Sequence, residues 1–244
     1  MRILDSRISD ADLAYINKAL PWYAATALPD GRIVASLTAR PGKREVVEPI
    51  PDPRITHLDQ AIGLEGKDVL EVGCFEGIHT LGLWCYGANV TAVDLRFENV
   101  LKSLARLAVY GASARVVRMD VEDAGVDLAR FDVVFHCGVL YHLEDPVQHL
   151  KRLLPCCDAI YLDTHIARED ETAATLHSGG RAWSGRHYVE GGLADPFSGR
   201  GASAFWLRLS DLQAILIEEG FACDLWQVRE ERNGPRVGLL GVRR

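Results

Sequence analysis

From residue 68 onward, short apolar runs alternate with segments in which apolar residues recur every three or four positions. The runs predict buried strands, and the recurring segments predict amphipathic helices. Strands that are apolar on both faces are typical of a parallel sheet covered by helices, so the pattern predicts an α/β fold. The predicted strands are 68–72, 89–94, 115–119, 131–136 and 158–163, and the predicted helices are 77–85, 97–110 and 146–154.

The end of the chain predicts a helix followed by a hairpin. Ser210 and Gln213 have the spacing of a capping box, and Gly220 supplies the stop of that helix. Asn233-Gly234 is a strong hairpin signal, so the last strand is expected to run antiparallel to its neighbour. The two strands of this hairpin are predicted at 221–228 and 236–242.

Two parts of the chain fall outside the alternation. Residues 1–65 contain a predicted helix at 10–20 and irregular chain around Pro51-Asp52-Pro53. We expect them to form an N-terminal extension packed on a main domain at 66–244. Residues 166–205 break the alternation with Gly, Arg, His and Trp, and are expected to form an insertion or lid, and the sequence leaves open whether it is ordered without substrate. Its aromatic and charged residues, Glu190 among them, suit a pocket cover.

The composition is that of an ordinary globular domain. The 244 residues are 48% hydrophobic and 25% charged, which suits one domain with a sizeable core. An apolar run of about 18 residues and a signal-peptide core are both absent, so no membrane span and a cytoplasmic location are expected. The formal charge of −7 disfavours nucleic acid as a partner. The six cysteines lack C-x-x-C spacing, which predicts reduced thiols and no metal site.

The first predicted strand ends in a motif that carries chemistry. Glu71-x-Gly73-x-x-x-Gly77 follows strand 68–72, and Asp94 ends the next strand. A strand, a glycine turn and a carboxylate on the neighbouring strand together form a device for holding a nucleoside. An NAD-dependent oxidoreductase is the weaker hypothesis, because its G-x-G-x-x-G fingerprint is interrupted by Phe75.

The alternation, the motif and the final hairpin resemble the class I S-adenosylmethionine (SAM)-dependent methyltransferases over about residues 66–165 and 206–244. The resemblance implies a Rossmann-like fold with a seven-stranded, mostly parallel sheet, an antiparallel last strand and helices on both faces. It also implies SAM as cofactor and S-adenosylhomocysteine (SAH) as product. Phe75 departs from the family, since many members have glycine there. The implied cofactor-binding residues are Glu71, Gly73, Cys74, Gly77, Asp94, Leu95, Asp120, Val121 and Cys137.

The resemblance also assigns roles to several of these residues. Glu71 is expected to orient the loop and to meet the amino group of SAM, often through water. Asp94 is expected to accept hydrogen bonds from both ribose hydroxyls, and Asp120 one from the exocyclic amine of adenine. Cys137 contributes its backbone beside the methionine group. The alternative reading of these acids is an ordinary surface carboxylate or a helix cap.

A narrower resemblance lies in Gly138-Val139-Leu140-Tyr141-His142-Leu143, which together with Trp22-Tyr23 is similar to the tRNA wobble-uridine carboxymethyltransferases and their small-molecule-acting relatives. An imidazole, which titrates near pH 6.5, suits proton removal at neutral pH. His142 is therefore the first candidate base and His165 the second, and Tyr141 is expected to orient the acceptor. The predicted substrate contacts are Tyr23, Asp163, His187, Tyr188 and Trp206.

The expected function is SAM-dependent transfer of a methyl group to a small-molecule acceptor by in-line displacement. Two alternatives stay open, an RNA-modifying methyltransferase and a SAM-binding protein without catalysis. The sequence also leaves open the identity of the acceptor, the atom that receives the methyl group and the formation of a homodimer.

Overall fold

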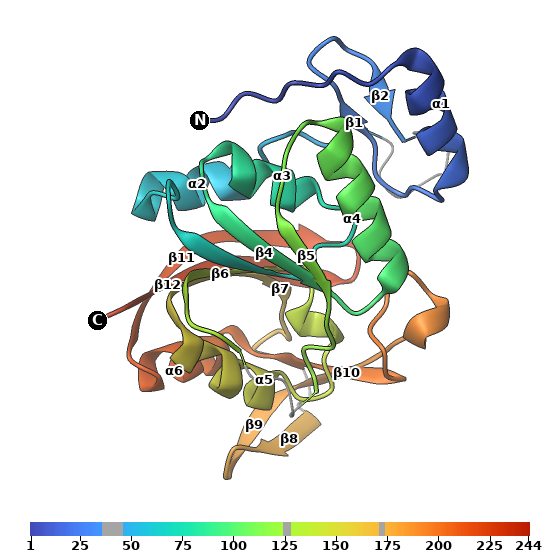
Figure 1. The fold of residues 1–244 in the computed structure, drawn as a ribbon. Helices are drawn as coiled ribbons and strands as arrows, with labels where there is room; N and C mark the ends of the chain where they lie inside the picture. Colours follow the sequence, from blue (N-terminus) through green and yellow to red (C-terminus); the bar gives the residue numbers. More distant parts are fainter. Residues whose placement is uncertain (36–45, 124–127, 171–173) are drawn as a thin grey trace. The chain divides into compact units, whose positions relative to one another are not determined.

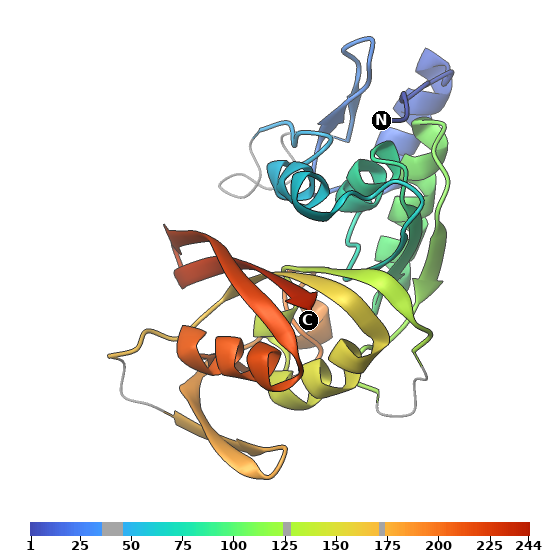
Figure 2. The ribbon, with the colours of Figure 1, turned by 90° about the vertical axis from the view of Figure 1, so that its left-hand side faces the viewer.

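The structure is a computed structural model that describes residues 1–35, 46–123, 128–170 and 174–244. The chain divides into two compact units, Met1–Asp120 and Val121–Arg244. Figure 1 and Figure 2 show the strands and helices of both units from two directions. Each unit holds part of the predicted strand–helix alternation.

The first unit contains three parallel strands in the order β3-β4-β5. Their bounds and those of the connecting helices agree with the predicted ones to within one residue. The parallel register pairs Val72 with Val93, so the carboxyl ends of β3 and β4 lie at one edge of the sheet, where ligands bind in open α/β sheets. The elements are β3 (Asp68–Val72), α3 (Ile78–Cys85), β4 (Asn89–Asp94), α4 (Phe97–Val109) and β5 (Arg115–Arg118).

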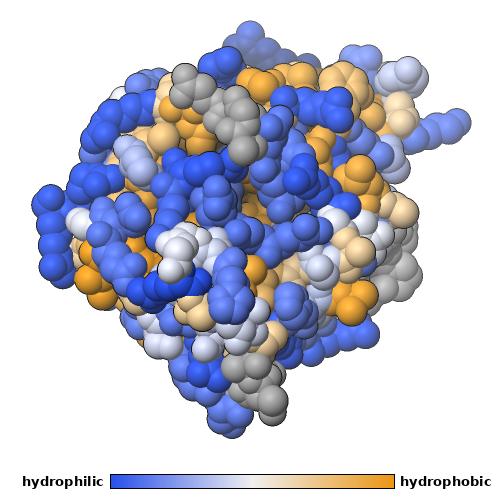
Figure 3. All heavy atoms as spheres, turned by 90° about the horizontal axis from the view of Figure 1, so that it is seen from below, coloured by the Kyte–Doolittle hydropathy of each residue, from blue (hydrophilic) through white to orange (hydrophobic). Residues whose placement is uncertain are grey.

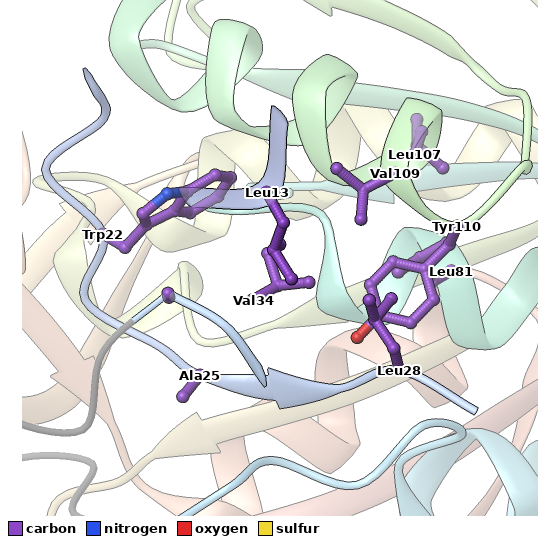
Figure 4. Packing of buried hydrophobic residues seen from close by; sticks show 10 residues of the cluster. Leu13, Trp22, Ala25, Leu28, Val34, Leu81, Leu107, Val109 and Tyr110 are labelled. Atoms are coloured by element: carbon purple, nitrogen blue, oxygen red, sulfur yellow. The ribbon is translucent and has the colours of Figure 1, made fainter. Parts of the chain in front are cut away.

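The N-terminal segment packs on helices α3 and α4 through an apolar cluster (Figure 4). Helix α1 (Asp10–Ala19) and the short hairpin of β1 (Thr26–Ala27) and β2 (Ile33–Val34) contribute side chains to it. The segment therefore contacts the sheet-covering helices of its own unit, whereas a domain boundary at residue 65 stays a prediction. The cluster includes Leu13, Trp22, Ala25, Leu28, Val34, Leu81, Leu107, Val109 and Tyr110.

The prediction of irregular chain around Pro51-Asp52-Pro53 holds for Pro51 and Asp52 and was wrong for Pro53, which begins helix α2 (Pro53–Ile62). The Asp52 side chain caps the helix by accepting a hydrogen bond from the backbone N–H of Arg54 at 2.8 Å. Pro53 takes the first helical turn, where a missing N–H loses no partner. The proline after the aspartate therefore marks the start of a helix.

Helix α4 leaves three of its apolar side chains exposed. Phe97, Leu101 and Leu104 are 58%, 45% and 44% exposed. The opposite face buries Lys102 and Arg106, because both form ion pairs with Glu76 in the loop after β3. The buried face of this helix therefore combines ion pairs to Glu76 with the apolar side chains of Leu107 and Val109.

The second unit contains four strands in the order β11-β12-β7-β6. Strands β6 and β7 are parallel, and β12 runs antiparallel to both of its neighbours, as the hairpin signal at Asn233-Gly234 predicts. Helices α5 and α6 pack against each other (Figure 2). The elements are β6 (Phe131–Cys137), α5 (Pro146–Leu153), the turn η2 (Leu154–Cys156), β7 (Cys157–His165), α6 (Leu209–Glu218), β11 (Phe221–Glu231) and β12 (Gly234–Arg243).

The segment predicted to be an insertion folds into a three-stranded antiparallel sheet, which the sequence pattern did not predict. Its order is β10-β9-β8, and β8 and β9 form the hairpin drawn in light orange in Figure 1. A Cβ on Gly185 would lie 2.1 Å from the carbonyl oxygen of Trp206, so only glycine lets these strands meet. Residues 171–173 lie outside the described residues. The elements are β8 (Ala174–Ser178), β9 (Arg181–Val189), the turn η3 (Gly192–Ala194) and β10 (Ser203–Leu207).

The predicted capping box of helix α6 was wrong. The helix begins at Leu209, and its N-cap residue Arg208 makes no side-chain capping bond. The hydroxyl of Ser210 lies inside the first turn and donates to Glu169 Oε1 at 3.0 Å. The Ser210 hydroxyl therefore bonds to Glu169, 41 residues away in the sequence, and does not cap the helix.

The surface shown in Figure 3 is mostly hydrophilic, with hydrophobic residues in small separate groups. Such scattered apolar groups are ordinary for a protein surface. Within the described ranges, every helix is too short or too polar to cross a bilayer.

Candidate active site

The loop between β3 and α3 in the first unit is fixed by its own backbone. The N–H groups of Gly73 and Cys74 both donate to the carbonyl oxygen of Val93, at 2.9 and 3.0 Å. Gly73 and Gly77 have φ angles of 74° and 76°, a left-handed conformation that favours glycine. At Gly77 a Cβ would also lie 2.9 Å from the Cα of Ser103, so the approach of α4 requires glycine there as well.

Phe75 occupies the place in this loop where the resemblance expects glycine, and its φ angle of +50° is left-handed. For a residue with a side chain this conformation costs about 1–2 kcal/mol. Three contacts hold it in place. Its N–H donates to Asp94 Oδ2 at 2.9 Å, its carbonyl accepts from Ser103 Oγ at 3.1 Å, and its ring stacks on Tyr23. Strain held by surrounding contacts is a common property of functional loops.

Asp94 connects this loop to helix α4. Its Oδ1 accepts hydrogen bonds from the N–H of Arg96 and the side chain of Asn99, at 2.9 and 3.0 Å, and its Oδ2 accepts one from Phe75. Burial raises the pKa of Asp94, and these hydrogen bonds oppose the rise. A carboxylate oxygen can accept two hydrogen bonds. Beside the hydrogen bonds described, Oδ2 therefore keeps capacity for one further donor, which fits one ribose hydroxyl, whereas the prediction assigned both to Asp94.

Glu71 is a buried acid with an oxygen that has no partner. Its Oε2 accepts a hydrogen bond from Thr80 Oγ1 at 2.5 Å, whereas Oε1 is buried and makes no hydrogen bond within the part of the chain that the structure describes. Burial raises the pKa of Glu71 to about 8, and the nearby charge of Asp94 adds to the rise. An unsatisfied buried acceptor is costly unless a ligand or water completes it. The site therefore fits a ligand that brings a donor or an ammonium group.

A buried ion cluster, formed by Glu76, Lys102 and Arg106, ties the N-terminal segment to the same loop. The Glu76 carboxylate accepts from the backbone N–H groups of Tyr23 and Ala24, at 2.8 and 2.9 Å. Lys102 and Arg106 lie 3.0 and 3.4 Å from it, and all three charged side chains are fully buried. The ammonium of Lys102 also lies 4.3 Å from the centre of the Tyr23 ring. Tyr23 is thereby held against Phe75.

In the second unit, aromatic rings gather around the helical turn η1 (Leu140–His142). The Tyr141 ring lies 4.2 Å from that of His142 and 4.8 Å from that of His165. Trp206 stacks on His165 at 4.8 Å and on Tyr188 at 4.6 Å, and its Nε1 donates to the carbonyl of Tyr141 at 2.8 Å. Strand β10 thus fastens the insertion to the turn that carries His142.

His142 is held by one ring nitrogen. Its Nδ1 lies 2.9 Å from Glu190 Oε1, and its side chain is 19% exposed. Among the described residues, no hydrogen bond to its Nε2 is found. The carboxylate of Glu190 also accepts from the hydroxyl of Ser198 and from the N–H of Gly199. An imidazole with one nitrogen fixed and the other accessible has the arrangement of a general base.

His165 and Asp163 are more fully engaged with protein groups. His165 Nδ1 lies 3.3 Å from the carbonyl of Pro235 and its Nε2 lies 3.6 Å from Glu231. Burial and the charge of Arg236 lower the pKa of His165. Asp163 is fully buried between Arg229 and Arg236, with which it forms ion pairs. His142 is therefore better placed than His165 to exchange a proton with a ligand.

Known proteins share this fold. A methyltransferase domain family model matches residues 70–157. The N-terminal domain of EvdMO1, in a crystal structure obtained in the presence of SAH and D-fucose, has a TM-score of 0.79 and 25% identity, over 98% of this chain and 100% of that one. The chain has the fold of the class I SAM-dependent methyltransferases, and residues 70–157 match their domain family. This likeness confirms the predicted fold class, an α/β Rossmann-like fold with a mostly parallel seven-stranded sheet and an antiparallel last strand.

Other methyltransferases match shorter or more distant parts. The tRNA U34 carboxymethyltransferase of Trichlorobacter lovleyi is 33% identical over 48% of this chain and 38% of its own length. The ubiquinone biosynthesis O-methyltransferase of Coxiella burnetii is 32% identical over 45% of this chain and 47% of its own length. The match thus spans less than half of either relative. The magnesium protoporphyrin IX methyltransferase of Synechocystis PCC 6803, with bound SAM, shares the fold at a TM-score of 0.56 and 18% identity, over 78% of this chain and 76% of that one.

The remaining residues predicted for a methyltransferase cofactor site lie at strand ends. Cys74 is buried, with its Sγ 3.4 Å from Ser103 Oγ, and Leu95 is half-buried after β4. Asp120 is half-buried two residues after β5. In the second unit, the carbonyl of Val121 accepts from Arg152 at 2.6 Å, and Cys137 is buried at the end of β6.

The predicted substrate residues of this methyltransferase fall into two groups. Tyr23 belongs to the first unit, at the loop of Phe75. Tyr188 and Trp206 join the aromatic group of the second unit, whereas His187 is exposed and touches only the edge of Phe205 among the rings described. The contact of Glu190 with His142 escaped sequence reasoning, because 48 residues separate the two and no local pattern links them.

Proposed function

We propose that this chain is a SAM-dependent methyltransferase that methylates a hydroxyl group of a small molecule, with a sugar as the first candidate. The observation that carries the proposal is the buried, unpartnered oxygen of Glu71 beside the left-handed glycine loop. The solved neighbour crystallised with SAH and D-fucose, and the relatives that methylate an oxygen in ubiquinone biosynthesis, support the acceptor class.

In this proposal the first unit binds the cofactor. Bound SAM supplies a methyl group that its sulfonium already activates. Glu71 Oε1 would accept from the amino group of the cofactor, and the free capacity of Asp94 Oδ2 would accept from a ribose hydroxyl. Asp120, Leu95, Val121 and Cys137 remain proposed contacts on the strength of the family resemblance.

The second unit supplies the acceptor chemistry. A neutral sugar hydroxyl is a weak nucleophile, so removal of its proton by a positioned base assists methyl transfer. His142 Nε2 would take that proton, and Tyr141 would orient the acceptor. Tyr188, at the exposed side of the stacked rings, would contact the C–H face of a sugar. Orientation alone can contribute about 7–11 kcal/mol to the lowering of the barrier.

Calorimetry with SAH tests the cofactor half of the proposal. The wild-type chain is expected to bind SAH. Asp94→Asn is expected to weaken binding at least tenfold, because it replaces the carboxylate that accepts from a ribose hydroxyl with an amide that carries an NH2 donor. A folded wild-type chain that binds no SAH at millimolar concentration would overturn the proposal.

Methyl transfer tests the acceptor half. Labelled SAM is incubated with the chain and a panel of free sugars and nucleotide-linked sugars that includes D-fucose, and the products are separated by mass. Transfer to a hydroxyl of at least one sugar is expected. If the label moves only to a metabolite without a sugar, the acceptor class is wrong while the methyltransferase assignment stands.

An RNA acceptor is the second candidate, because the tRNA U34 carboxymethyltransferase of Trichlorobacter lovleyi is a relative at 33% identity. The net charge of −7 speaks against it, since nucleic-acid binding depends on phosphate neutralisation by basic residues. Incubation with labelled SAM and total tRNA, followed by nucleoside analysis, decides between the two. A cytoplasmic location and a homodimer stay predictions.

A further inference from the structure

We propose that Glu190 is the positioning residue of this methyltransferase: it keeps the hydrogen of the His142 ring on Nδ1 and so leaves the Nε2 lone pair free for the acceptor proton. The proposal rests on the proposed function of His142 as base. It adds a residue from the insertion, outside the segment that matches the family model.

The contacts of the Glu190 carboxylate dictate the direction of its bond to His142. Oε2 accepts from Ser198 Oγ and from Gly199 N, the latter at 2.8 Å, so both groups act as donors. Ser198 Oγ itself accepts from Gly191 N at 2.7 Å, which leaves its hydrogen for Glu190. The remaining oxygen, Oε1, lies 2.9 Å from His142 Nδ1. A carboxylate only accepts, so Nδ1 must carry the hydrogen.

The charge of Glu190 supports the same assignment. Burial would raise the pKa of Glu190, but the hydrogen bond and the charge of His142, with hydrogen bonds from Ser198 and Gly199, outweigh it and hold the pKa below its usual value. The group is therefore a carboxylate at neutral pH. Its side chain is 1% exposed, so water does not compete for the bond to His142.

The insertion is built to deliver this carboxylate. Glu190 directly follows β9, and the chain then turns back through η3 so that Ser198 and Gly199 close around it. A Cβ on Gly199 would lie 2.4 Å from the carbonyl oxygen of His142, so only glycine allows this loop to touch the turn η1. Strand β10 adds a second tie, because the N–H of Phe205 donates to the carbonyl of Leu143 at 2.9 Å.

The proposed step balances as follows. The acceptor hydroxyl gives its proton to His142 Nε2 while its oxygen forms a bond to the methyl carbon. The carbon–sulfur bond breaks, and its electron pair stays on sulfur as a neutral thioether. The imidazolium formed on His142 is stabilised by the Glu190 carboxylate until the proton passes to solvent.

Glu190→Gln is the central variant. Gly199 N–H can only donate, so the glutamine must place its carbonyl oxygen there and its NH2 group toward His142 Nδ1. That orientation moves the ring hydrogen to Nε2, which then cannot accept a proton. We expect kcat to fall by about 10²–10⁴-fold, the range for a base with the wrong tautomer, while the Kd for SAH stays within about twofold.

Two variants serve as comparisons. Glu144→Gln makes the same substitution two residues after His142, at an exposed side chain, and is expected to leave kcat within about twofold. Glu190→Asp keeps a carboxylate, and its kcat is expected to be at least tenfold higher than that of Glu190→Gln. A role limited to loop stability would instead lower kcat and SAH binding together.

The hydrogen position is also measured directly, without activity. Chain labelled with 15N at histidine rings is examined by NMR at neutral pH, and His142→Ala assigns the signals. We expect the hydrogen on Nδ1 in the wild type and on Nε2 in Glu190→Gln. A wild-type ring with its hydrogen on Nε2, or a glutamine variant with unchanged kcat, overturns the proposal. Failure of SAH binding or methyl transfer by the wild type refutes the proposed function instead, and the NMR result still decides the role of Glu190 at this ring.

Discussion

Two buried glutamates, one in each unit, differ in charge at neutral pH: Glu71 is protonated and neutral, and Glu190 is a carboxylate. Within the described ranges, Glu71 has a single donor, Thr80, and an oxygen without a partner, and burial raises its pKa to about 8. Glu190 has three donors, and their hydrogen bonds, with the charge of His142, hold its pKa below the usual value in spite of burial. Burial therefore does not fix the charge of a carboxyl group by itself, because the donors around it decide which form is stable.

The difference matches two chemical tasks. A neutral acid with an empty acceptor is poised to gain a cationic or donor-bearing ligand, which would then favour its ionised form. A carboxylate with every oxygen occupied is a fixed charge that orients a neighbouring ring. We infer that Glu71 changes state when the cofactor binds, whereas Glu190 stays charged throughout the reaction cycle.

Removal of the ring that Glu190 orients should give the largest effect. In His142→Ala the acceptor proton has no base, and kcat is expected to fall by about 10²–10⁴-fold, the usual scale for general-base catalysis, and at least as far as in Glu190→Gln. Steady-state methyl transfer at saturating SAM measures it. Binding of SAH by calorimetry is the control and should change little, since the proposed cofactor contacts of Glu71 and Asp94 lie in the other unit. Turnover within about threefold of the wild type would remove His142 from the role of base.

Two buried histidines extend the comparison to bases. His136 and His149 lie 2.9 Å apart at their Nε2 atoms, and His149 Nδ1 lies 3.2 Å from the carbonyl of Val121. Burial lowers the pKa of His149 to about 4 and that of His136 well below its usual value. His142 lies against the carboxylate of Glu190, whereas neither of these two rings lies against a carboxylate in the contacts described. Both are therefore expected to stay neutral in the folded chain.

Acid should therefore destabilise the fold. Both folded pKa values lie below the unfolded value of about 6.5, so the unfolded chain binds more protons and stability is lost as the pH falls from about 6.5 toward 4. For His149 alone the loss at pH 5 is about 2 kcal/mol. Urea unfolding at pH 7 and pH 5 measures it. His149→Asn keeps a donor for the carbonyl of Val121 but has no ring that titrates. Between pH 7 and pH 5 its free energy of unfolding should therefore fall by about 2 kcal/mol less than that of the wild type. An equal fall in both chains would contradict the lowered pKa of His149.

Sequence reasoning predicted the strands and the motifs at their ends more accurately than the contacts between segments that are distant in the sequence. Strand β3, the glycine turn and Asp94 are encoded within 27 residues by apolar runs and a carboxylate, so periodicity and motif locate them. The burial of Lys102 and Arg106 in α4 was hidden, because it depends on ion pairs with Glu76 from another element. The Asp52-Pro53 helix start was misread since proline marks both loops and first helical turns.

The candidate site divides in the same way. Glu71 was found because it begins the glycine motif at the end of strand 68–72, and His142 because it lies in the segment 138–143 that carries the narrower resemblance. Glu190 was seen only as a member of an aromatic and charged insertion, since the three-stranded sheet that carries it has no clear two-residue period around its glycines. Its partner is fixed by tertiary packing at Gly199, which a single sequence does not reveal.

The smallest effect is expected at Glu71, and it tests the neutral member of the pair. An ammonium group of the cofactor near Oε1 would favour the carboxylate, so binding should release a proton below pH 8, where the free chain holds one. The affinity for SAH is then expected to rise with pH, by up to about tenfold per unit between pH 6.5 and 8, and to level off above. Glu71→Gln, neutral at every pH, should bind SAH more weakly at pH 8.5 and show a flatter profile. Calorimetry in buffers of different protonation enthalpy measures the released proton directly. Equal slopes in both chains would mean that Glu71 keeps its proton in the complex and meets the cofactor as a donor.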